Sequence, residues 1–147
     1  MKTASLRRAT LAVVLALGAG GLGACEDAPG GPDDQTPAGL VVVDAQGNQV
    51  AAFDGISTTG GVRVSAGAQQ AFRVYLTGRG GGRISIDGGR YTLRPLVVTT
   101  ALAGVTLDGA DRVVVVGRSA GSTWLVLTIL QNGIALLPDA AVPLTVS

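Results

Sequence analysis

The stretch VVVVGRSAGSTWLVLTIL, which runs from Val113 to Leu130, decides the fold class. It contains two apolar runs, 113–116 and 124–130, separated by a segment of mostly small and polar residues. Both runs are rich in residues that favour strands, and both are too short for typical buried helices. Because they are apolar at consecutive positions, we expect two central strands, or strands covered on both faces.

The chain around this stretch repeats the same alternation of short apolar runs and glycine-rich turns. No long segment has a helical period, so residues 40–147 are predicted to form one all-β domain. Pro143 lacks an N–H group, which predicts an edge or a bulge at that point of the last strand. The expected strands lie at 40–44, 49–54, 62–65, 71–77, 83–87, 90–98, 112–117, 123–130, 133–137 and 141–146.

A Gly-Gly pair at 88–89 predicts a β-hairpin, since a two-residue glycine loop suits turns with positive φ. In this register Asp87 lies opposite Arg90, and Arg83 lies opposite Arg94. One face of the hairpin is then apolar and the other is polar, as expected for a sheet that packs on a core. The residues predicted to face the core are Ile84, Ile86, Tyr91 and Leu93.

Two passages of the domain resemble the bacterial immunoglobulin-like (Big-type) domains of adhesins and envelope proteins. One is 64–68, VSAGA, which leads into the strand at 72–76; the other is 114–123, VVVGRSAGST. In that family a v-x-G-x-x-a-G-x-t passage leads into the penultimate or last strand. The resemblance covers residues 60–130 and implies an immunoglobulin-like β-sandwich of about seven to ten short antiparallel strands. The segment 131–146 departs from the family pattern by adding a further apolar hairpin.

The first residues are organised as an export signal, with a positive region formed by Lys2, Arg7 and Arg8. The uncharged apolar segment that follows, 10–22, is shorter than the roughly 20 residues that a transmembrane helix needs. It ends in Leu22-Gly23-Ala24-Cys25, which resembles the lipobox of bacterial lipoproteins. This resemblance implies that the Cys25 thiol receives a diacylglycerol and that the Ala24–Cys25 bond is cut. Residues 1–24 are then a signal peptide, and the protein is lipid-anchored on the extracytoplasmic side of a bacterial envelope membrane.

Residues 25–39 are predicted to be a flexible acidic tether between the lipid and the domain. The segment 26–39, EDAPGGPDDQTPAG, contains three prolines, four acidic residues and no large apolar side chain. Such a segment buries too little surface to fold, and it reaches roughly 45 Å if extended at about 3.3 Å per residue. Removal of residues 1–24 leaves eight arginines and ten acids, so the formal charge becomes −2.

The composition excludes several kinds of chemistry. The chain of 147 residues has no histidine and one cysteine, which excludes Ser-His-Asp and Cys-His triads, the usual zinc sites and an internal disulfide. A formal charge of +1 argues against a strongly basic nucleic-acid binder. Asp108 and Asp111 flank a predicted turn, but the chain lacks the Asp-x-Asp-x-Asp-Gly spacing of calcium loops. We therefore expect no enzyme activity, no cofactor and no metal.

The predicted hairpin places Arg83 and Arg94 side by side on the solvent face, with Arg73 and Arg90 nearby. Like charges in direct opposition are mildly unfavourable, so such a cluster indicates either an anion or acidic-glycan site or arginines that only keep the face soluble.

Trp124 and Val126 fall on the reverse face of a strand whose Leu125, Leu127 and Ile129 fill the sandwich. We expect the hairpin at 131–146 to cover these two residues. If it does not, they form an apolar patch of the kind that protein partners bind.

These observations together predict a membrane-anchored lipoprotein of the bacterial cell envelope. Its immunoglobulin-like domain is expected to act as a non-catalytic structural or protein-interaction module. The alternatives are a carbohydrate- or anion-binding module that uses the arginine-bearing face, and an accessory subunit of an envelope complex.

Overall fold

The computed structural model describes residues 35–147. The predicted signal peptide, the Ala24–Cys25 cleavage and lipidation site, and the tether up to residue 34 lie outside the described residues. Within 35–147, every regular element is a strand, and no helix long and apolar enough to cross a membrane is found there.

The first sheet contains seven strands in the order β3-β2-β1-β5-β9-β8, with β6 paired to β5. All of its pairs are antiparallel. Its strands are β1 (Pro37–Val43), β2 (Gln49–Phe53), β3 (Thr58–Gly60), β5 (Gln69–Gly78), β6 (Arg83–Ser85), β8 (Ala103–Leu107) and β9 (Arg112–Gly117).

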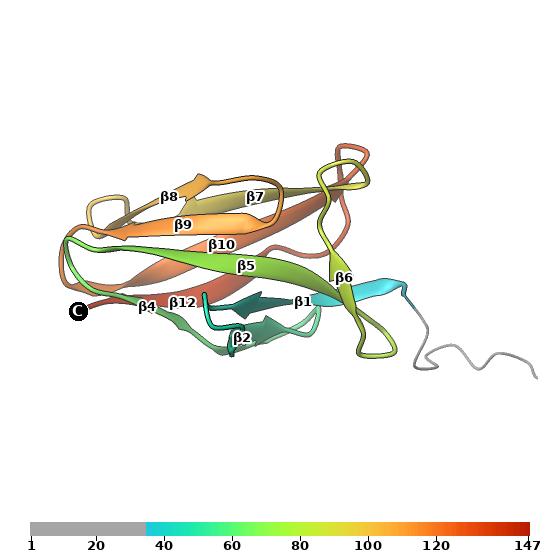
Figure 1. Ribbon diagram of the computed structural model, residues 1–147, viewed down its shortest axis with the longest axis horizontal. Helices are drawn as coiled ribbons and strands as arrows, with labels where there is room; N and C mark the ends of the chain where they lie inside the picture. Colours follow the sequence, from blue (N-terminus) through green and yellow to red (C-terminus); the bar gives the residue numbers. More distant parts are fainter. Residues whose placement is uncertain (1–34) are drawn as a thin grey trace, which may run out of the picture.

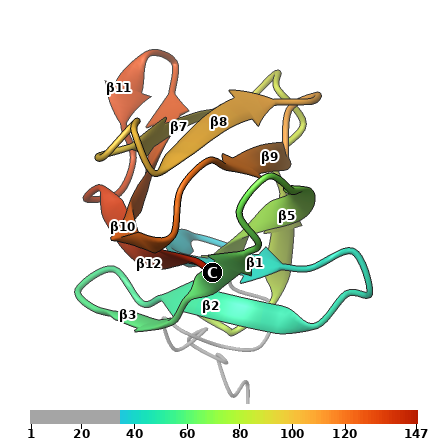
Figure 2. The same ribbon diagram turned by 90° about the vertical axis from the view of Figure 1, so that its left-hand side faces the viewer.

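The second sheet contains five strands in the order β11-β10-β12-β4, with β7 on the other edge of β10. The pair β12–β4 is parallel, and the other pairs are antiparallel. Its strands are β4 (Val62–Val64), β7 (Tyr91–Val97), β10 (Gly121–Gln131), β11 (Ile134–Ala135) and β12 (Ala140–Val146). In the end view of Figure 2 the first sheet curves from β8 through β9 and β5 to β1 and β2, and it encloses the core with β10 and β12.

The strand order is that of an immunoglobulin-like sandwich. In the first sheet β5-β9-β8 have the order and directions of strands B, E and D, and in the second β7-β10-β12 have those of C, F and G. β1 and β2 extend the first sheet beyond β5 (Figure 1). The chain then passes from β3 of the first sheet to β4 of the second. The prediction of an all-β immunoglobulin-like sandwich is confirmed, with one parallel pair in addition.

The core is formed by inward-facing residues of both sheets. Leu125, Leu127 and Ile129 of β10 are at most 1% exposed, which confirms the face predicted for them. β9 lies between β5 and β8, and β10 lies between β7 and β12, so both runs of the opening stretch are central strands as expected. Other fully buried side chains include Leu40, Phe72, Val74, Leu76, Leu93, Val115 and Leu144.

The hairpin predicted at Gly88-Gly89 is wrong. β6 pairs with β5 in the first sheet, and β7 pairs with β10 in the second, so the loop at 86–90 carries the chain from one sheet to the other. Ile86, Tyr91 and Leu93 are nevertheless buried, because inward alternation does not depend on which strand is the neighbour. The local pattern therefore predicted the faces of these residues and failed on their partners.

Strand boundaries differ from the prediction at three places. β1 begins at Pro37, within the segment assigned to the tether, because Pro37 and Gly39 already pair with Gly78 and Thr77. β3 and β8 were not expected, since neither short segment carries a strong apolar pattern. After β10 the chain adds the two-residue β11 and one long strand, β12, in place of a full hairpin.

The edge predicted at Pro143 is confirmed, because β12 has no partner strand on one side at this residue. It lies in β12 opposite Trp124, and pairing of β12 with β4 begins only at the next residue, Leu144. The missing N–H group therefore falls outside the β12–β4 ladder.

Candidate functional site

The arginines that were expected to form one cluster lie on different sheets. Arg83 of β6 is opposite Thr77 in the first sheet, and Arg94 of β7 is opposite Thr128 in the second. The predicted opposition of Arg83 and Arg94 is therefore wrong, since it depended on the hairpin that does not form. Arg90 lies in the loop before β7, with its guanidinium carbon 5.2 Å from the centre of the Tyr91 ring.

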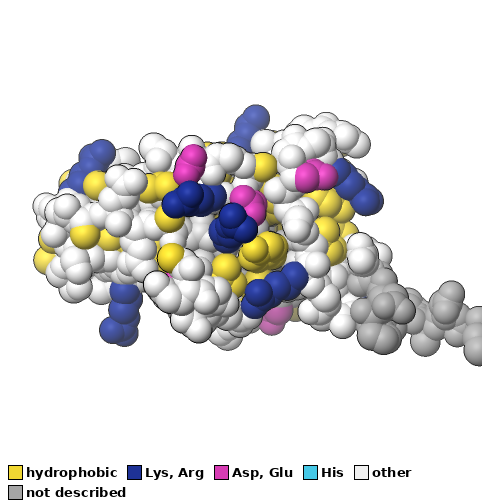
Figure 3. All heavy atoms as spheres, viewed as in Figure 1, with side chains coloured by type: hydrophobic (Ala, Val, Ile, Leu, Met, Phe, Trp, Pro, Cys, Tyr) yellow, Lys and Arg dark blue, Asp and Glu magenta, His cyan; other side chains and the backbone are white. Residues whose placement is uncertain are grey.

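A different group of arginines meets on the outer face of the first sheet. Arg73 of β5 lies directly opposite Arg112 of β9. Tyr75 is the next outward-facing residue of β5, and the guanidinium carbon of Arg83 lies 5.6 Å from the centre of its ring. Figure 3 shows dark-blue basic side chains gathered with acidic ones around an apolar area on this face. Arg112 was missed because a single arginine before a valine run gives no indication of its neighbour across the sheet.

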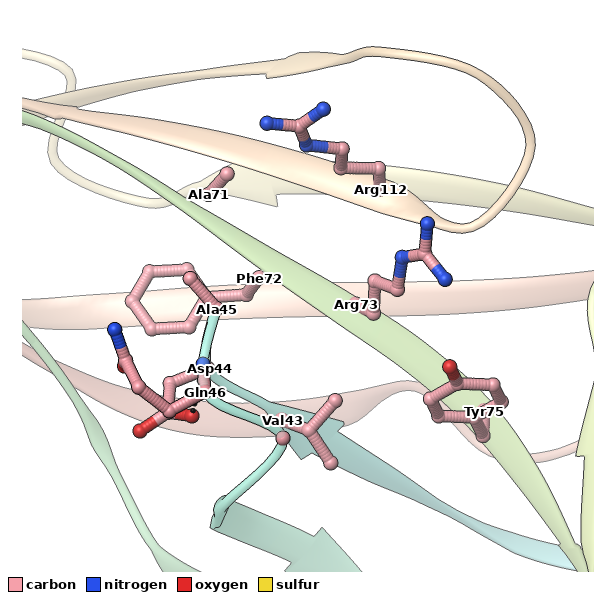
Figure 4. Close-up of a pocket in the computed structure, with 10 residues that line it drawn as sticks. Val43, Asp44, Ala45, Gln46, Ala71, Phe72, Arg73, Tyr75 and Arg112 are labelled. Carbon is pink, nitrogen blue, oxygen red and sulfur yellow. Dashed lines mark hydrogen bonds between the residues drawn. The ribbon is translucent and has the colours of Figure 1, made fainter.

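A pocket of about 430 Å³ opens beside this group. Arg73, Tyr75 and Arg112 line it on one side, and the turn that follows β1 lines it on the other (Figure 4). The remaining lining residues are Val43, Asp44, Ala45, Gln46, Gly47, Ala71 and Phe72. A volume of this size falls within the range of small-ligand sites, roughly 300–1,000 Å³.

The outer face of β1 beside this pocket is apolar. Val41 and Val43 point away from the core, yet they are 6% and 3% exposed. Their cross-strand neighbours on β5 are Tyr75 and Arg73, whose long side chains can cover them. The outer face of β1 and β5 thus combines an apolar base with cationic groups above it.

The charges around the pocket are partly compensated. Arg112 forms an ion pair with Asp108 at 3.1 Å, and both side chains are about half exposed or more. Hydrogen bonding to the Tyr75 hydroxyl, together with the nearby Asp111 carboxylate, raises the pKa of Arg73. Arg73 is therefore charged at any physiological pH. The exposed ion pair of Arg112 with Asp108 adds little to stability.

The Asp44 carboxylate is hydrogen-bonded within its own turn. Its carboxylate accepts hydrogen bonds from the backbone N–H groups of Gln46 at 2.9 Å and Asn48 at 2.8 Å. A third, from the Asn48 side-chain amide, is 3.1 Å long. The side-chain bond from Asn48 is the main cause that lowers the pKa of Asp44. In Figure 4 the turn 44–46 lies on the far side of Val43 from Arg73 and Tyr75.

The second candidate surface is the outer face of the second sheet. Trp124 is 48% exposed, and the segment 131–146 does not cover it, because β12 lies beside β10 in the same sheet. The expectation of a covered surface is therefore wrong for Trp124, whereas Val126 is half-buried, and the alternative of an apolar patch describes the face around Trp124. Val98 donates its N–H to the Trp124 carbonyl at 3.0 Å, which brings β7 alongside.

The apolar patch extends over three neighbouring strands. Leu96 of β7 pairs with Val126 of β10, and Pro143 of β12 pairs with Trp124. Leu96 and Val98 are 58% and 59% exposed. A hollow of about 350 Å³ between Trp124 and Pro143 is lined by Thr99, Ser122, Thr123, Leu144 and Thr145 as well. We call the residues Leu96, Val98, Trp124, Val126 and Pro143 the tryptophan patch.

The aspartates that were considered as calcium ligands lie in turns of the structure. Asp108 and Asp111 lie in the β8–β9 turn, and Asp54 caps the β2–β3 turn through the N–H groups of Ile56 and Ser57. Among residues 35–147, no three His, Cys, Asp or Glu side chains are grouped in a way that could hold a metal ion.

No family model matches the chain, and no curated protein matches it in sequence. Among solved structures, domains 5–6 of the S-layer protein SbsC are 22% identical, with a TM-score of 0.45 over 59% of this chain and 39% of that chain. Domains 4 and 5 of SbsC are 16% identical, with a TM-score of 0.46 over 73% of this chain and 75% of that chain. The likeness concerns the fold, and the immunoglobulin-like assignment rests on the strand order described above.

Proposed function

We propose that this protein is a bacterial cell-envelope lipoprotein whose non-catalytic Big-type domain binds a protein partner through the tryptophan patch. The observation that carries the proposal is the exposure of Trp124, Leu96 and Val98 on one sheet face. Large contiguous apolar patches are uncommon on monomeric proteins, and tryptophan is among the residues that contribute most to binding energy in interfaces. The patch also has a hollow beside Trp124 that a partner side chain would fill.

The position of the patch agrees with anchoring through the amino-terminal segment. Pro37 pairs with Gly78 at one end of the sandwich, whereas Gly121, at the start of β10, pairs with Val146 at the other end. The described chain enters at the first end and the carboxyl terminus lies at the second (Figure 1). Trp124 is three residues from Gly121, so the patch lies in the half of the domain opposite the end at which the described chain enters.

Site-specific crosslinking tests the interaction. A photoreactive residue placed at Trp124 in the full lipidated protein is expected to capture one recurrent envelope protein in cells. The matched control is the same residue at Thr106, which is exposed on β8 of the other sheet. If position 124 captures only the abundant proteins that position 106 also captures, the tryptophan patch is not a binding surface.

Anchoring is tested separately through Cys25. The wild-type protein is expected in the membrane fraction with a mass above that of its peptide chain, because acyl chains hold it there. Cys25→Ser removes the thiol that accepts the lipid, so uncut precursor should accumulate. Recovery of wild-type protein as a soluble species of plain peptide mass would refute the anchor and leave the binding proposal standing.

A further inference from the structure

We propose that the pocket between β5, β9 and the turn after β1 binds the carboxylate of an acidic saccharide, held by Arg73 and Arg112. This site lies on the first sheet, so it is separate from the tryptophan patch and does not depend on lipid anchoring. It also differs from the Arg83/Arg94 cluster expected from the sequence, which the sheet topology divides.

The cationic side of the pocket selects an anion. Arg73 and Arg112 are direct cross-strand neighbours, and their guanidinium groups point apart in Figure 4. Like charges on neighbouring residues repel each other, and a ligand anion beside them reduces that repulsion. Guanidinium groups also match the geometry of a carboxylate through paired hydrogen bonds, and the Tyr75 hydroxyl beside Arg73 adds a further polar group.

Three acids lie near this cationic side: Asp108 pairs with Arg112, Asp111 lies near Arg73, and Asp44 lines the pocket. Asp108 occupies one edge of Arg112 at 3.1 Å, in an exposed pair that exchanges readily with solvent and with other anions. Asp44, the carboxylate that lines the pocket, is already engaged by three hydrogen-bond donors of its own turn. A guanidinium has five N–H donors, so Arg112 can keep its contact with Asp108 and donate to a ligand oxygen as well.

The rest of the pocket favours a sugar over a bare anion. Ala71 and the ring of Tyr75 are partly exposed in the lining and provide apolar surface on which the C–H face of a pyranose ring can rest. The opposite wall is the turn 44–47, where the Gln46 amide and backbone groups can meet hydroxyls. A volume of about 430 Å³ is far larger than one carboxylate requires. The site therefore suits a ring that carries one anionic group and several hydroxyls.

Calorimetric titration of the full lipidated protein in neutral detergent micelles tests this proposal. The probes are tri-galacturonate and, as its uncharged counterpart, a galactose trisaccharide. We expect binding of tri-galacturonate that weakens with added salt and no detectable binding of the neutral sugar. Absence of binding to tri-galacturonate at millimolar concentration, or equal binding of both sugars, would overturn the proposal.

Single substitutions then locate the site. Arg73→Ala and Arg112→Ala are each expected to weaken binding about tenfold or more, because each removes charge-assisted hydrogen bonds. Arg94→Ala is the matched control, since Arg94 is an exposed strand arginine on the opposite sheet. Equal losses from Arg94→Ala and Arg73→Ala would mean unspecific attraction and would refute the site.

Two further measurements separate shape from charge. Arg73→Lys keeps the charge and loses the paired donors, so we expect an intermediate affinity. Inorganic phosphate should bind far more weakly than tri-galacturonate, and equal affinity would refute the role of the apolar surface. Crosslinking through position 124 should be unchanged in Arg73→Ala, so failure of this proposal is distinguishable from failure of the proposed function.

Discussion

At the scale of single residues, Gly117 shows why the passage between β9 and β10 requires glycine. A Cβ at Gly117 would lie 2.4 Å from the carbonyl oxygen of Ser65, a backbone atom that cannot move aside easily. At the second glycine of the passage, Gly121, φ is +152°, and a Cβ would meet the Leu102 side chain at 3.0 Å. Steric constraints therefore explain why both positions of the v-x-G-x-x-a-G-x-t pattern are glycine in this chain.

We predict that Gly117→Ala lowers the free energy of unfolding by about 1–3 kcal/mol, because the new methyl group forces the β4–β5 turn and the end of β9 apart. Urea denaturation followed by circular dichroism measures this difference. Gly82→Ala is the control, since nothing lies within 4 Å of its Cβ position, and it should change stability by less than about 0.5 kcal/mol. Equal stability of both variants would contradict the steric argument.

Three turn aspartates connect stability to pH. Hydrogen bonds from Asn48, Ser57 and Arg90 are the leading causes that lower the pKa values of Asp44, Asp54 and Asp87, respectively, below 3.8. A carboxyl whose pKa is lower in the folded state stabilises the fold fully above its unfolded pKa. That contribution is lost as the pH falls through the folded value. Stability should thus be constant from neutral pH down to about pH 5 and should decline below about pH 4.

Replacement of Asp44, Asp54 and Asp87 together by asparagine tests this dependence. Asparagine keeps an oxygen acceptor for the turn N–H groups but has no proton to gain. The urea midpoint of the triple variant should therefore change less between about pH 5 and pH 2.5 than that of the wild type. An unchanged slope would assign the acid sensitivity to other carboxyls.

At the scale of the strand, β10 separates the two roles of the domain by alternation alone. Its inward residues fill the core, while Trp124 and Val126 on the other face belong to the tryptophan patch. The sequence predicted this division correctly, because a period of two is a property of the strand itself. Whether the outward face is covered depends on where the next strand goes, and β12 goes beside β10 and not over it.

Adjacent substitutions in β10 should therefore have opposite consequences. Leu125→Ala is expected to cost about 2–5 kcal/mol, since Leu125 is 0% exposed and its loss leaves a cavity. Trp124→Ala should cost much less stability and should abolish capture of the partner. Thermal denaturation measures the first effect and co-purification the second. A Trp124 variant as unstable as the Leu125 variant would place Trp124 in the core and contradict its role in binding.

At the scale of the whole molecule, the domain begins earlier than its composition indicates. β1 lies between β2 and β5 in the first sheet. Leu40 and Val42 of this strand are 1% and 0% exposed. A chain that begins at Gln35 should therefore melt at the same temperature as the full protein. A chain that begins at Ala45 lacks β1 and should be unfolded, because it loses several core side chains and natural stabilities are only about 5–15 kcal/mol. Cooperative melting of the shorter chain would show that β1 is dispensable.

The two proposed binding surfaces lie on opposite sheets and use different chemistry. The tryptophan patch is apolar, and the pocket of Arg73 and Arg112 combines cationic groups with apolar surface. The two proposals thus assign a protein partner to one sheet and an acidic glycan to the other. The separation of the surfaces is why each can be altered without the other.

The sequence by itself determined the features that depend on local spacing. These are the all-β class, the central strands of the opening stretch, the inward residues of β10, and the turn at Asp108–Asp111. The sandwich type was also predicted from the sequence, through the resemblance of the passage at 117–123. This passage connects β9 to β10, and its glycines are required sterically.

Only the tertiary structure decided which strands are neighbours. The loop at 86–90 looks like a hairpin turn, yet β6 pairs with β5 in the first sheet and β7 pairs with β10 in the second. These pairings separate Arg83 from Arg94. The pairing of β5 with β9 brings Arg73 opposite Arg112, and the position of β12 beside β10 leaves Trp124 exposed. Local pattern specifies which face of a strand is buried, whereas cross-strand pairing is settled by the packing of the entire core.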